Sequence, residues 1–245
     1  MKHSIARICA FVNGDYRSVL RDSMMMVIFV SPLIMGLGVR IIIPYIFEQI
    51  LNFLKFDFTQ YMTGIAGFLL QIPPLMYGMV AGFIILDERD DGVLQYLTVT
   101  PLSRTGYLVY RISMPAIAGT VASALFLLIC DLVQYFTFRL LPLFFLAALG
   151  APLVSLLLAS FAHDKVEALT LAKAASFILI PGFVVFFTDS PLQFLCGITP
   201  SFWVIKATLA MYAHDPLYLV YVGTGVIVTV LYIWMLVRRF SSKVL

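Results

Sequence analysis

The chain has 245 residues, of which 62% are hydrophobic and only 12% are charged. Soluble domains usually hold about 45 to 50% apolar and about 25% charged residues, so this composition excludes an ordinary soluble domain and indicates an integral membrane protein. The net charge of +3 is spread over several short segments. Such a distribution gives no reason to expect a nucleic-acid partner.

Residues 1–23 are predicted to form a basic amphipathic helix that lies in the membrane interface. Arg7, Arg17 and Arg21 stand mostly off its apolar stripe, as expected for a helix with one face among lipid headgroups. The alternative is a frayed basic tail, since Asn13-Gly14 is a pair that interrupts helices. The stripe recurs every three to four residues and consists of Ile5, Ile8, Val12, Tyr16 and Val19.

Apolar runs long enough to cross the bilayer follow this segment. A span of the roughly 30 Å hydrocarbon layer needs about 20 residues in a helix. Six runs meet this length, at residues 24–47, 61–86, 108–130, 138–161, 168–188 and 217–237. Because they are continuously apolar, helices are favoured over barrel strands, in which polar residues would alternate. We expect one all-α polytopic membrane domain over residues 1–245, surrounded by membrane lipid.

Prolines and glycines mark the first two spans. Pro32 in the first span and Pro73-Pro74 in the second should bend the helix and leave backbone carbonyls for neighbouring groups to satisfy. Small residues also permit close helix packing. The small residues of the second span either allow ordinary packing in the bundle or form a face that moves or lines a dimer interface, and the sequence leaves both alternatives open. The second span carries Gly64, Gly67, Gly78 and Gly82.

The distribution of Lys and Arg predicts the orientation in the membrane. Six spans place both termini on the same side, and basic residues accumulate on the cytoplasmic side. With the termini inside, only Arg40, Lys55, Arg139 and Lys206 fall outside. The other twelve would be cytoplasmic: Lys2, Arg7, Arg17, Arg21, Arg89, Arg104, Arg111, Lys165, Lys173, Arg238, Arg239 and Lys243. We therefore expect cytoplasmic N and C termini.

The outer segment, residues 189–216, contains two helix-start signals. Ser190-Pro191 and Thr199-Pro200 each place a capping hydroxyl before a proline suited to a first helical turn. The pieces that follow are apolar but too short to cross the bilayer separately. We predict short re-entrant helices that enter from the outer face before the last span. A plain extracellular loop is the alternative.

The loop after the second span, residues 87–104, concentrates charge. Acidic residues favour the start of a helix, where they meet the positive end of its dipole, and Pro101 would end that helix. Val93, Leu94 and Leu97 would share one face of two turns, with Gln95 elsewhere. The alternative is an ordinary hairpin loop whose charges keep it out of the lipid. The acidic residues before Gly92 are Asp87, Glu88, Asp90 and Asp91.

This loop also carries a family resemblance. The order Glu88-Arg89, two residues, Gly92, Leu94, Leu97, Thr100-Pro101 and Ser103 resembles the signature after the second span of permeases in the type-2 ATP-binding-cassette (ABC-2) exporter family. In that family the loop forms a coupling helix that docks on the nucleotide-binding subunit, so the resemblance implies this role for residues 93–100. Asp91 departs from the pattern, since family members often carry a basic or neutral residue there. The implied coupling set is Glu88, Arg89, Gly92, Val93, Leu94, Leu97, Thr100 and Pro101.

The second cytoplasmic loop, residues 163–167, is short and charged. Its counterpart in the family also faces the ATPase, so the resemblance implies a second contact at His163, Asp164 and Glu167. A solvated turn explains these residues equally well. His163 and Glu167 have the i, i+4 spacing of a helical metal pair, but no third ligand is nearby, and we predict no metal site.

The energy source is expected on another chain. An ATP-driven transporter needs a phosphate-binding loop of the form G-x-x-x-x-G-K-[ST], and this sequence has no Gly-Lys pair. We therefore expect no cofactor here, and ATP with Mg²⁺ in a separate ABC ATPase subunit. The resemblance further implies a second permease half, as a homodimer or heterodimer, in the plasma membrane of a prokaryote. The expected function is export of a substrate that the sequence does not identify.

An ion-coupled secondary transporter is the main alternative. Such carriers place ionisable residues near the bilayer midplane, whereas Arg40 and Lys173 lie within reach of an interface. A membrane enzyme is disfavoured, because no Ser, His and Asp arrangement for nucleophilic catalysis can be drawn from the sequence. We expect a transport subunit and not an enzyme.

Overall fold

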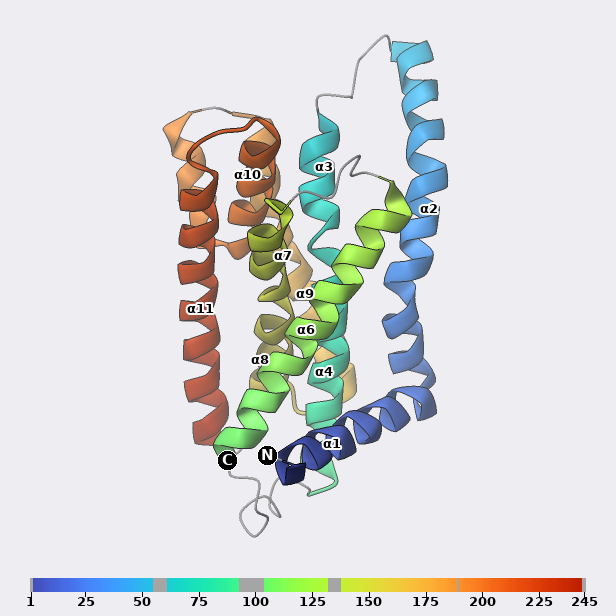
Figure 1. The fold of residues 1–245 in the computed structure, drawn as a ribbon, viewed down its shortest axis with the longest axis vertical. Coiled ribbons are helices and arrows are strands. Elements are labelled where there is room, and N and C mark those ends of the chain that lie inside the picture. Colours follow the sequence, from blue (N-terminus) through green and yellow to red (C-terminus); the bar gives the residue numbers. More distant parts are fainter. Residues whose placement is uncertain (1, 55–60, 93–103, 132–137, 189, 244–245) are drawn as a thin grey trace.

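A computed structural model describes residues 2–54, 61–92, 104–131, 138–188 and 190–243, and Figure 1 shows a helical bundle with both chain termini at one end. We call this end the terminal end and the opposite one the far end. No strand occurs within these ranges. They contain six helical segments long and apolar enough to cross a membrane: Ser23–Gln49, Met62–Asp90, Gly106–Cys130, Leu140–Phe161, Lys165–Phe186 and Tyr218–Ser242. The predicted all-α polytopic fold is confirmed, and each predicted run overlaps one of these segments.

Several spans consist of two consecutive helices. The second span joins α3 to α4, the fourth joins α7 to α8, and the fifth passes from α9 into the 3₁₀ helix η2. The described helices are α1 (Lys2–Arg21), α2 (Ser23–Leu54), α3 (Met62–Leu69), α4 (Ile72–Asp90), α6 (Arg104–Cys130), α7 (Leu140–Ala148), α8 (Gly150–Phe161), α9 (Lys165–Ser176), η2 (Phe177–Phe186), η3 (Pro191–Ile198), α10 (Pro200–Tyr212) and α11 (Tyr218–Lys243).

The predicted proline effects differ between the first two spans. The first span, α2, continues through Pro32 as one helix. Proline has no N–H for the carbonyl four residues earlier, and the Ser31 hydroxyl donates to that carbonyl, Ile28 O, at 2.8 Å. In the second span, α4 begins at Ile72, so Pro73-Pro74 lie in its first turn, where a missing N–H costs nothing. The second span is therefore interrupted and the first is not.

Helix α1 crosses the terminal end of the bundle, and the chain then turns sharply into α2 (Figure 1). The helix runs unbroken through Asn13-Gly14, so the predicted amphipathic helix forms and the frayed tail is wrong. At the turn, the Asp22 carboxylate accepts hydrogen bonds from the amides of Met24 and Met25 at 2.9 and 3.3 Å. Asp22 therefore caps the first span, and Val19 of α1 is buried in the apolar cluster next to it.

Close packing of α4 against α8 requires a glycine. A Cβ atom at position 78 would lie 2.8 Å from the Cα of Ala151 in α8, a distance that no real side chain tolerates. Gly64, Gly67 and Gly82 also face atoms of neighbouring helices within this chain. Packing inside the bundle therefore explains the glycines of the second span.

The outer segment folds back into the bundle at the far end. Helix α10 is buried along most of its length and packs against α3, α7, α11 and η2. The Trp203 indole N–H donates to Gly197 O at 2.7 Å, and the Ser201 hydroxyl donates to Ile178 O of η2 at 2.7 Å. These contacts fix the hairpin formed by η3 and α10.

The turn of this hairpin reaches deep into the bundle. The Tyr232 hydroxyl donates to Ile198 O at 3.1 Å, and Tyr232 is the fifteenth residue of the 26-residue helix α11. The turn therefore lies near the middle of the last span, so the predicted re-entrant helices are confirmed and a plain loop is wrong. Ser190 caps η3 as predicted, through a bond from Leu192 N. The predicted cap at Thr199 is wrong, because its hydroxyl donates to Cys196 O instead.

Candidate functional site

The acidic residues at positions 87–91 lie at the end of α4. The helix continues to Asp90, Asp91 is its last partly helical residue, and Gly92 has a φ of +70°. Glycine adopts this left-handed backbone without the steric cost that other residues meet, so Gly92 ends the helix. The expectation that these carboxylates begin a following helix is corrected. They lie where the helix dipole disfavours negative charge, so nearby cations must offset them.

Arg111 is the central cation of the terminal end. Its side chain is only 3% exposed, and its Nη1 lies 2.9 Å from Asp15 Oδ2 of α1. Its Nε donates to Glu88 Oε2 of α4 at 3.1 Å, and its Nη2 donates to Glu88 Oε1. The hydroxyls of Tyr107 and Tyr110 donate to Glu88 Oε2 and Asp15 Oδ2 at 2.7 and 2.8 Å. These five residues, here named the Arg111 network, join α1, α4 and α6.

The chemistry of arginine explains why it occupies this position. A guanidinium presents five N–H donors in a planar fork, so one side chain binds two carboxylates at once. The rings of Tyr107 and Tyr110 also lie 5.5 and 5.3 Å from Arg111 Cζ, within range of a cation–π contact. Burial of a charge that has no partner costs roughly several kcal/mol of folding free energy. The network offsets this cost only while all its partners are present.

Arg89 points toward the turn between α8 and α9. Its Nη1 and Nη2 donate to Ala162 O at 3.0 Å and His163 O at 2.6 Å, carbonyls that follow the end of α8. The next residues cap α9 in a manner similar to a capping box, except that Glu167 binds the amide of His163, the residue before the N-cap Asp164. Asp164 Oδ1 accepts from Glu167 N at 2.7 Å, and Glu167 Oε2 accepts from His163 N at 2.6 Å. The carboxylates of the predicted second contact thus stabilise the start of α9.

Lys165 links the same region to the first turn of α2. Its Nζ lies 2.6 Å from Asp22 Oδ2 and 2.9 Å from Asp87 Oδ1. The hydrogen bond from Lys165 lowers the pKa of the Asp22 carboxyl below its ordinary value of 3.8. All three side chains are partly exposed, so this bridge contributes little to stability compared with the buried Arg111 network.

Three consecutive residues therefore fasten the end of α4. Asp87 reaches α9, Glu88 reaches α6, and Arg89 reaches the turn between α8 and α9. Glu88 and Arg89 of the predicted coupling set are engaged inside the chain. The rest of that set beyond Gly92 lies outside the described residues: Val93, Leu94, Leu97, Thr100 and Pro101.

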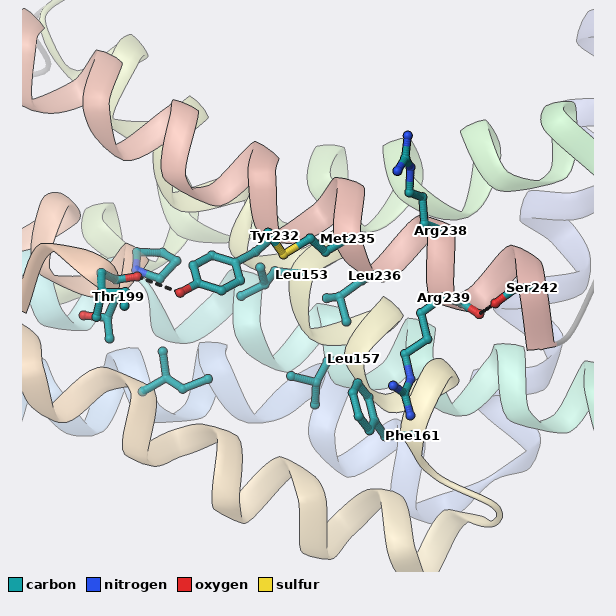
Figure 2. A pocket seen from close by; sticks show the side chains of 13 residues that line it. Leu153, Leu157, Phe161, Thr199, Tyr232, Met235, Leu236, Arg238, Arg239 and Ser242 are labelled. Carbon is teal, nitrogen blue, oxygen red and sulfur yellow. Dashed lines mark hydrogen bonds between the residues drawn. The ribbon is translucent and has the colours of Figure 1, made fainter.

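A groove of about 710 Å³ lies between α11 and the pair formed by α8 and η2. Figure 2 shows Leu153, Leu157 and Phe161 of α8 facing Tyr232 and Leu236 of α11 across it. The turn between η3 and α10 forms its inner end, and the last turns of α11 form its mouth at the terminal end. The walls are apolar, while both ends carry polar groups.

Sequence reasoning missed two polar arrangements. The pairing of Arg111 with Asp15 was not anticipated, although an arginine eight residues into an apolar helix signals a buried partner. Lys206 lies on α10, within the predicted outer segment, but its pairing was not anticipated: its Nζ donates to Gln193 Oε1 at 3.2 Å. The signal for that pair was Gln193 itself, a buried amide in the otherwise apolar helix η3.

Within the described ranges, no group of three or more His, Cys, Asp or Glu side chains is placed to hold a metal ion.

Comparison with known proteins identifies the family. Residues 15–237 match the family described as "Rv2686c-like: Fluoroquinolones export permease protein Rv2686c-like". The chain belongs to this family of export permeases. Two curated relatives are the "Fluoroquinolones export permease protein" Rv2686c of Mycobacterium tuberculosis strain ATCC 25618 / H37Rv and MT2760 of strain CDC 1551 / Oshkosh. Each is 27% identical over 240 residues, covering 96% of this chain and 94% of the relative. No solved structure matches the chain.

The family agrees with the earlier resemblance. An export permease with six apolar spanning segments in its described residues is a membrane transport subunit rather than an enzyme. The expectation of a type-2 ABC permease, drawn from the residues around Glu88 and Pro101, is confirmed at the level of the family. The permease therefore functions in efflux.

Proposed function

We propose that this permease is the membrane-spanning subunit of an ATP-driven ABC exporter whose ATPase is a separate nucleotide-binding subunit. ATP and Mg²⁺ bind to that partner, since this sequence lacks the Gly-Lys pair of a phosphate-binding loop. A second permease half, either another copy or a sister chain, completes the transport path. The family match and the signature at residues 88–103 support this proposal.

The orientation that suits this function places the terminal end in the cytoplasm of a prokaryotic cell, with the chain in the plasma membrane. Arg89, Arg111 and Lys165 lie together at that end, and Arg238 and Arg239 stand near the end of α11. Cytoplasmic loops of membrane proteins carry an excess of basic residues. The carboxylates of the same end are largely paired with these cations.

The observation that carries the coupling proposal is the fastening of α4 by Asp87, Glu88 and Arg89. In the proposal, Val93, Leu94 and Leu97 contact the ATPase, while Glu88 and Arg89 position the segment that begins after Gly92. Closure of the ATPase pushes on this segment. Because the end of α4 is bonded to α6, α9 and the α8–α9 turn, these helices move as one body. Such rigid-body tilting opens an outward path.

The relatives indicate a class of substrate. Both carry fluoroquinolone export in their names and align with almost the whole chain. In the proposal, this permease likewise exports small aromatic antibiotics of the fluoroquinolone class.

The test is purification of a tagged copy from its native host in mild detergent, with mass spectrometry of the proteins that remain bound. A nucleotide-binding subunit should be recovered with the wild type. Leu97→Asp should abolish its recovery, because a charge then faces the apolar contact of the ATPase. Gln95→Asp adds the same charge off the predicted face and should leave recovery unchanged. Absence of any ATPase after crosslinking, or equal losses with both variants, would overturn the coupling assignment.

A further inference from the structure

The groove between α11 and the α8–η2 pair has a size suited to a small molecule. Its volume of about 710 Å³ lies within the range of roughly 300 to 1,000 Å³ found for drug-sized ligands. Leu153, Leu157 and Phe161 line one wall at i, i+4 and i+8 of α8, so one face of that helix is apolar. Aromatic and branched side chains of this kind suit a flat apolar ligand body.

The mouth of the groove carries the cation Arg239. Tyr232, Leu236 and Arg239 lie at i, i+4 and i+7 of α11 and so share the face that lines the groove. The Arg239 Cζ lies 4.0 Å from the centre of the Phe161 ring, and Figure 2 shows the two side chains next to each other. In the described part of the chain, no carboxylate lies within 4.0 Å of this guanidinium. None of the residues assigned to the groove is acidic.

The inner end of the groove offers hydrogen-bond acceptors. The Tyr232 hydroxyl already donates to Ile198 O at 3.1 Å, and the Thr199 hydroxyl already donates to Cys196 O at 2.8 Å. Each oxygen therefore retains lone pairs that accept a bond from a ligand. An amine or ammonium group is the complementary partner for such an end.

We propose that this groove binds an aromatic zwitterion of drug size, with its carboxylate at Arg239 and its amine at Tyr232 and Thr199. The proposal rests on the export function proposed above. It adds the binding site and the orientation of the substrate within that site. Arg239 follows Tyr232 by seven positions, which is about 10 Å along α11. A lipid acyl chain fits the apolar walls but would bring its methyl end against the two hydroxyls, so the charge pattern favours a ligand that is polar at both ends.

Arg238 provides a matched control. It is the next residue along α11, is also exposed and also contributes to the lining of the groove, but its guanidinium Cζ lies 3.7 Å from the centre of the Trp234 ring. Figure 2 shows its side chain pointing in the opposite direction from that of Arg239. A substitution at Arg238 therefore removes the same charge from the same helix turn without removing the proposed carboxylate contact.

The experiment measures equilibrium binding of norfloxacin, a fluorescent zwitterion, to the purified permease in detergent without any ATPase. Arg239→Gln should weaken binding at least tenfold, Tyr232→Phe should weaken it severalfold, and Arg238→Gln should leave it unchanged. Arg239→Lys keeps the positive charge and should retain most of the affinity. Unchanged thermal unfolding shows that each variant is folded. The methyl ester of norfloxacin should bind equally weakly to the wild type and to Arg239→Gln.

Three results would overturn the proposal: no binding to the wild type, equal effects at Arg238 and Arg239, or loss of co-purified anionic phospholipid in Arg239→Gln with norfloxacin affinity unchanged. The last result would make the groove a lipid site. Because no ATP is involved, failure of ATP-driven export would leave this binding result intact, so the two proposals fail separately.

Discussion

Glu88 of α4 and Arg111 of α6 form a two-point ion pair at the terminal end of the bundle, and Asp15 of α1 binds the same guanidinium. The arginine side of this ion pair is buried. It joins the last turn of the helix before the proposed coupling segment to the first turns of the next span. In the proposed mechanism, this pair passes a motion of that segment to the helix that follows it in the chain.

Loss of Arg111 should destabilise the permease strongly. Arg111→Met leaves Glu88 and Asp15 facing one another without their cation, and breaking a buried pair in this way costs about 3 to 5 kcal/mol. We expect a clear fall of the melting temperature in detergent. The melting temperature of Arg111→Lys should lie between those of the wild type and Arg111→Met, because an ammonium keeps the charge but not the planar fork.

A double variant separates the charge effect from packing. Adding Glu88→Gln to Arg111→Met removes one of the two unpaired carboxylates and should restore part of the lost stability. Arg238→Met removes an exposed arginine and should change the melting temperature little. Equal stability of Arg111→Met and Arg238→Met would contradict the network.

The Lys165 bridge predicts a pH dependence. Because the folded-state pKa of Asp22 lies below its ordinary value of 3.8, the ionised carboxylate stabilises the fold above that pH, and the contribution is lost as the pH falls through the lowered pKa. Lys165→Met should therefore cost under about 1 kcal/mol at pH 7. The difference from wild type should shrink toward pH 3.

The matched control for this bridge is Lys173→Met. Lys173 is exposed on the same helix and makes no salt bridge within the described residues. The melting temperature of Lys173→Met should equal that of the wild type at every pH. A stability difference for Lys165→Met that grows on acidification would have the wrong sign and would exclude the assignment.

Any side chain at position 78 should destabilise the fold. Its added Cβ would lie 2.8 Å from the Ala151 Cα, so Gly78→Ala should cost about 1 to 3 kcal/mol through overpacking. At Gly223 in α11 nothing lies within 4 Å of the same atom. Gly223→Ala should be neutral or stabilising by up to about 1 kcal/mol. Thermal unfolding of the two variants side by side measures the contrast, and similar values would argue against the close α4–α8 contact.

Single cysteines should report the orientation in a variant without the native cysteines. Ala213→Cys stands exposed at the far end and Ser241→Cys stands exposed near the end of α11. A membrane-impermeant maleimide should label residue 213 in intact cells and residue 241 only after permeabilisation. The reverse pattern would invert the proposed topology.

The spans and the re-entrant hairpin were predictable because they depend on local composition. A continuous apolar run of about 20 residues has few alternatives to a helix, and Ser190-Pro191 marks a helix start within an apolar outer segment. The break at Pro73-Pro74 follows in the same way from the missing N–H.

The site was less predictable because its contacts join distant parts of the chain. Nothing local to Glu88 indicates that its partner is Arg111, or that Arg89 reaches Ala162, 73 residues further along the chain. The boundary after Leu86 was also misplaced. The acidic residues looked like the start of a new helix, yet α4 continues to Asp90 because Arg111 and Lys165 offset their charge. Tertiary ion pairs here override the helix-dipole preference.

The most direct test of ATP-driven export uses inverted membrane vesicles from the native host, in which outward transport becomes accumulation. Norfloxacin should accumulate when ATP and Mg²⁺ are added, even with a protonophore present. Leu97→Asp should abolish this accumulation and Gln95→Asp should preserve it. Accumulation that requires an ion gradient, stops with the protonophore and ignores ATP would contradict the account and favour an ion-coupled secondary transporter.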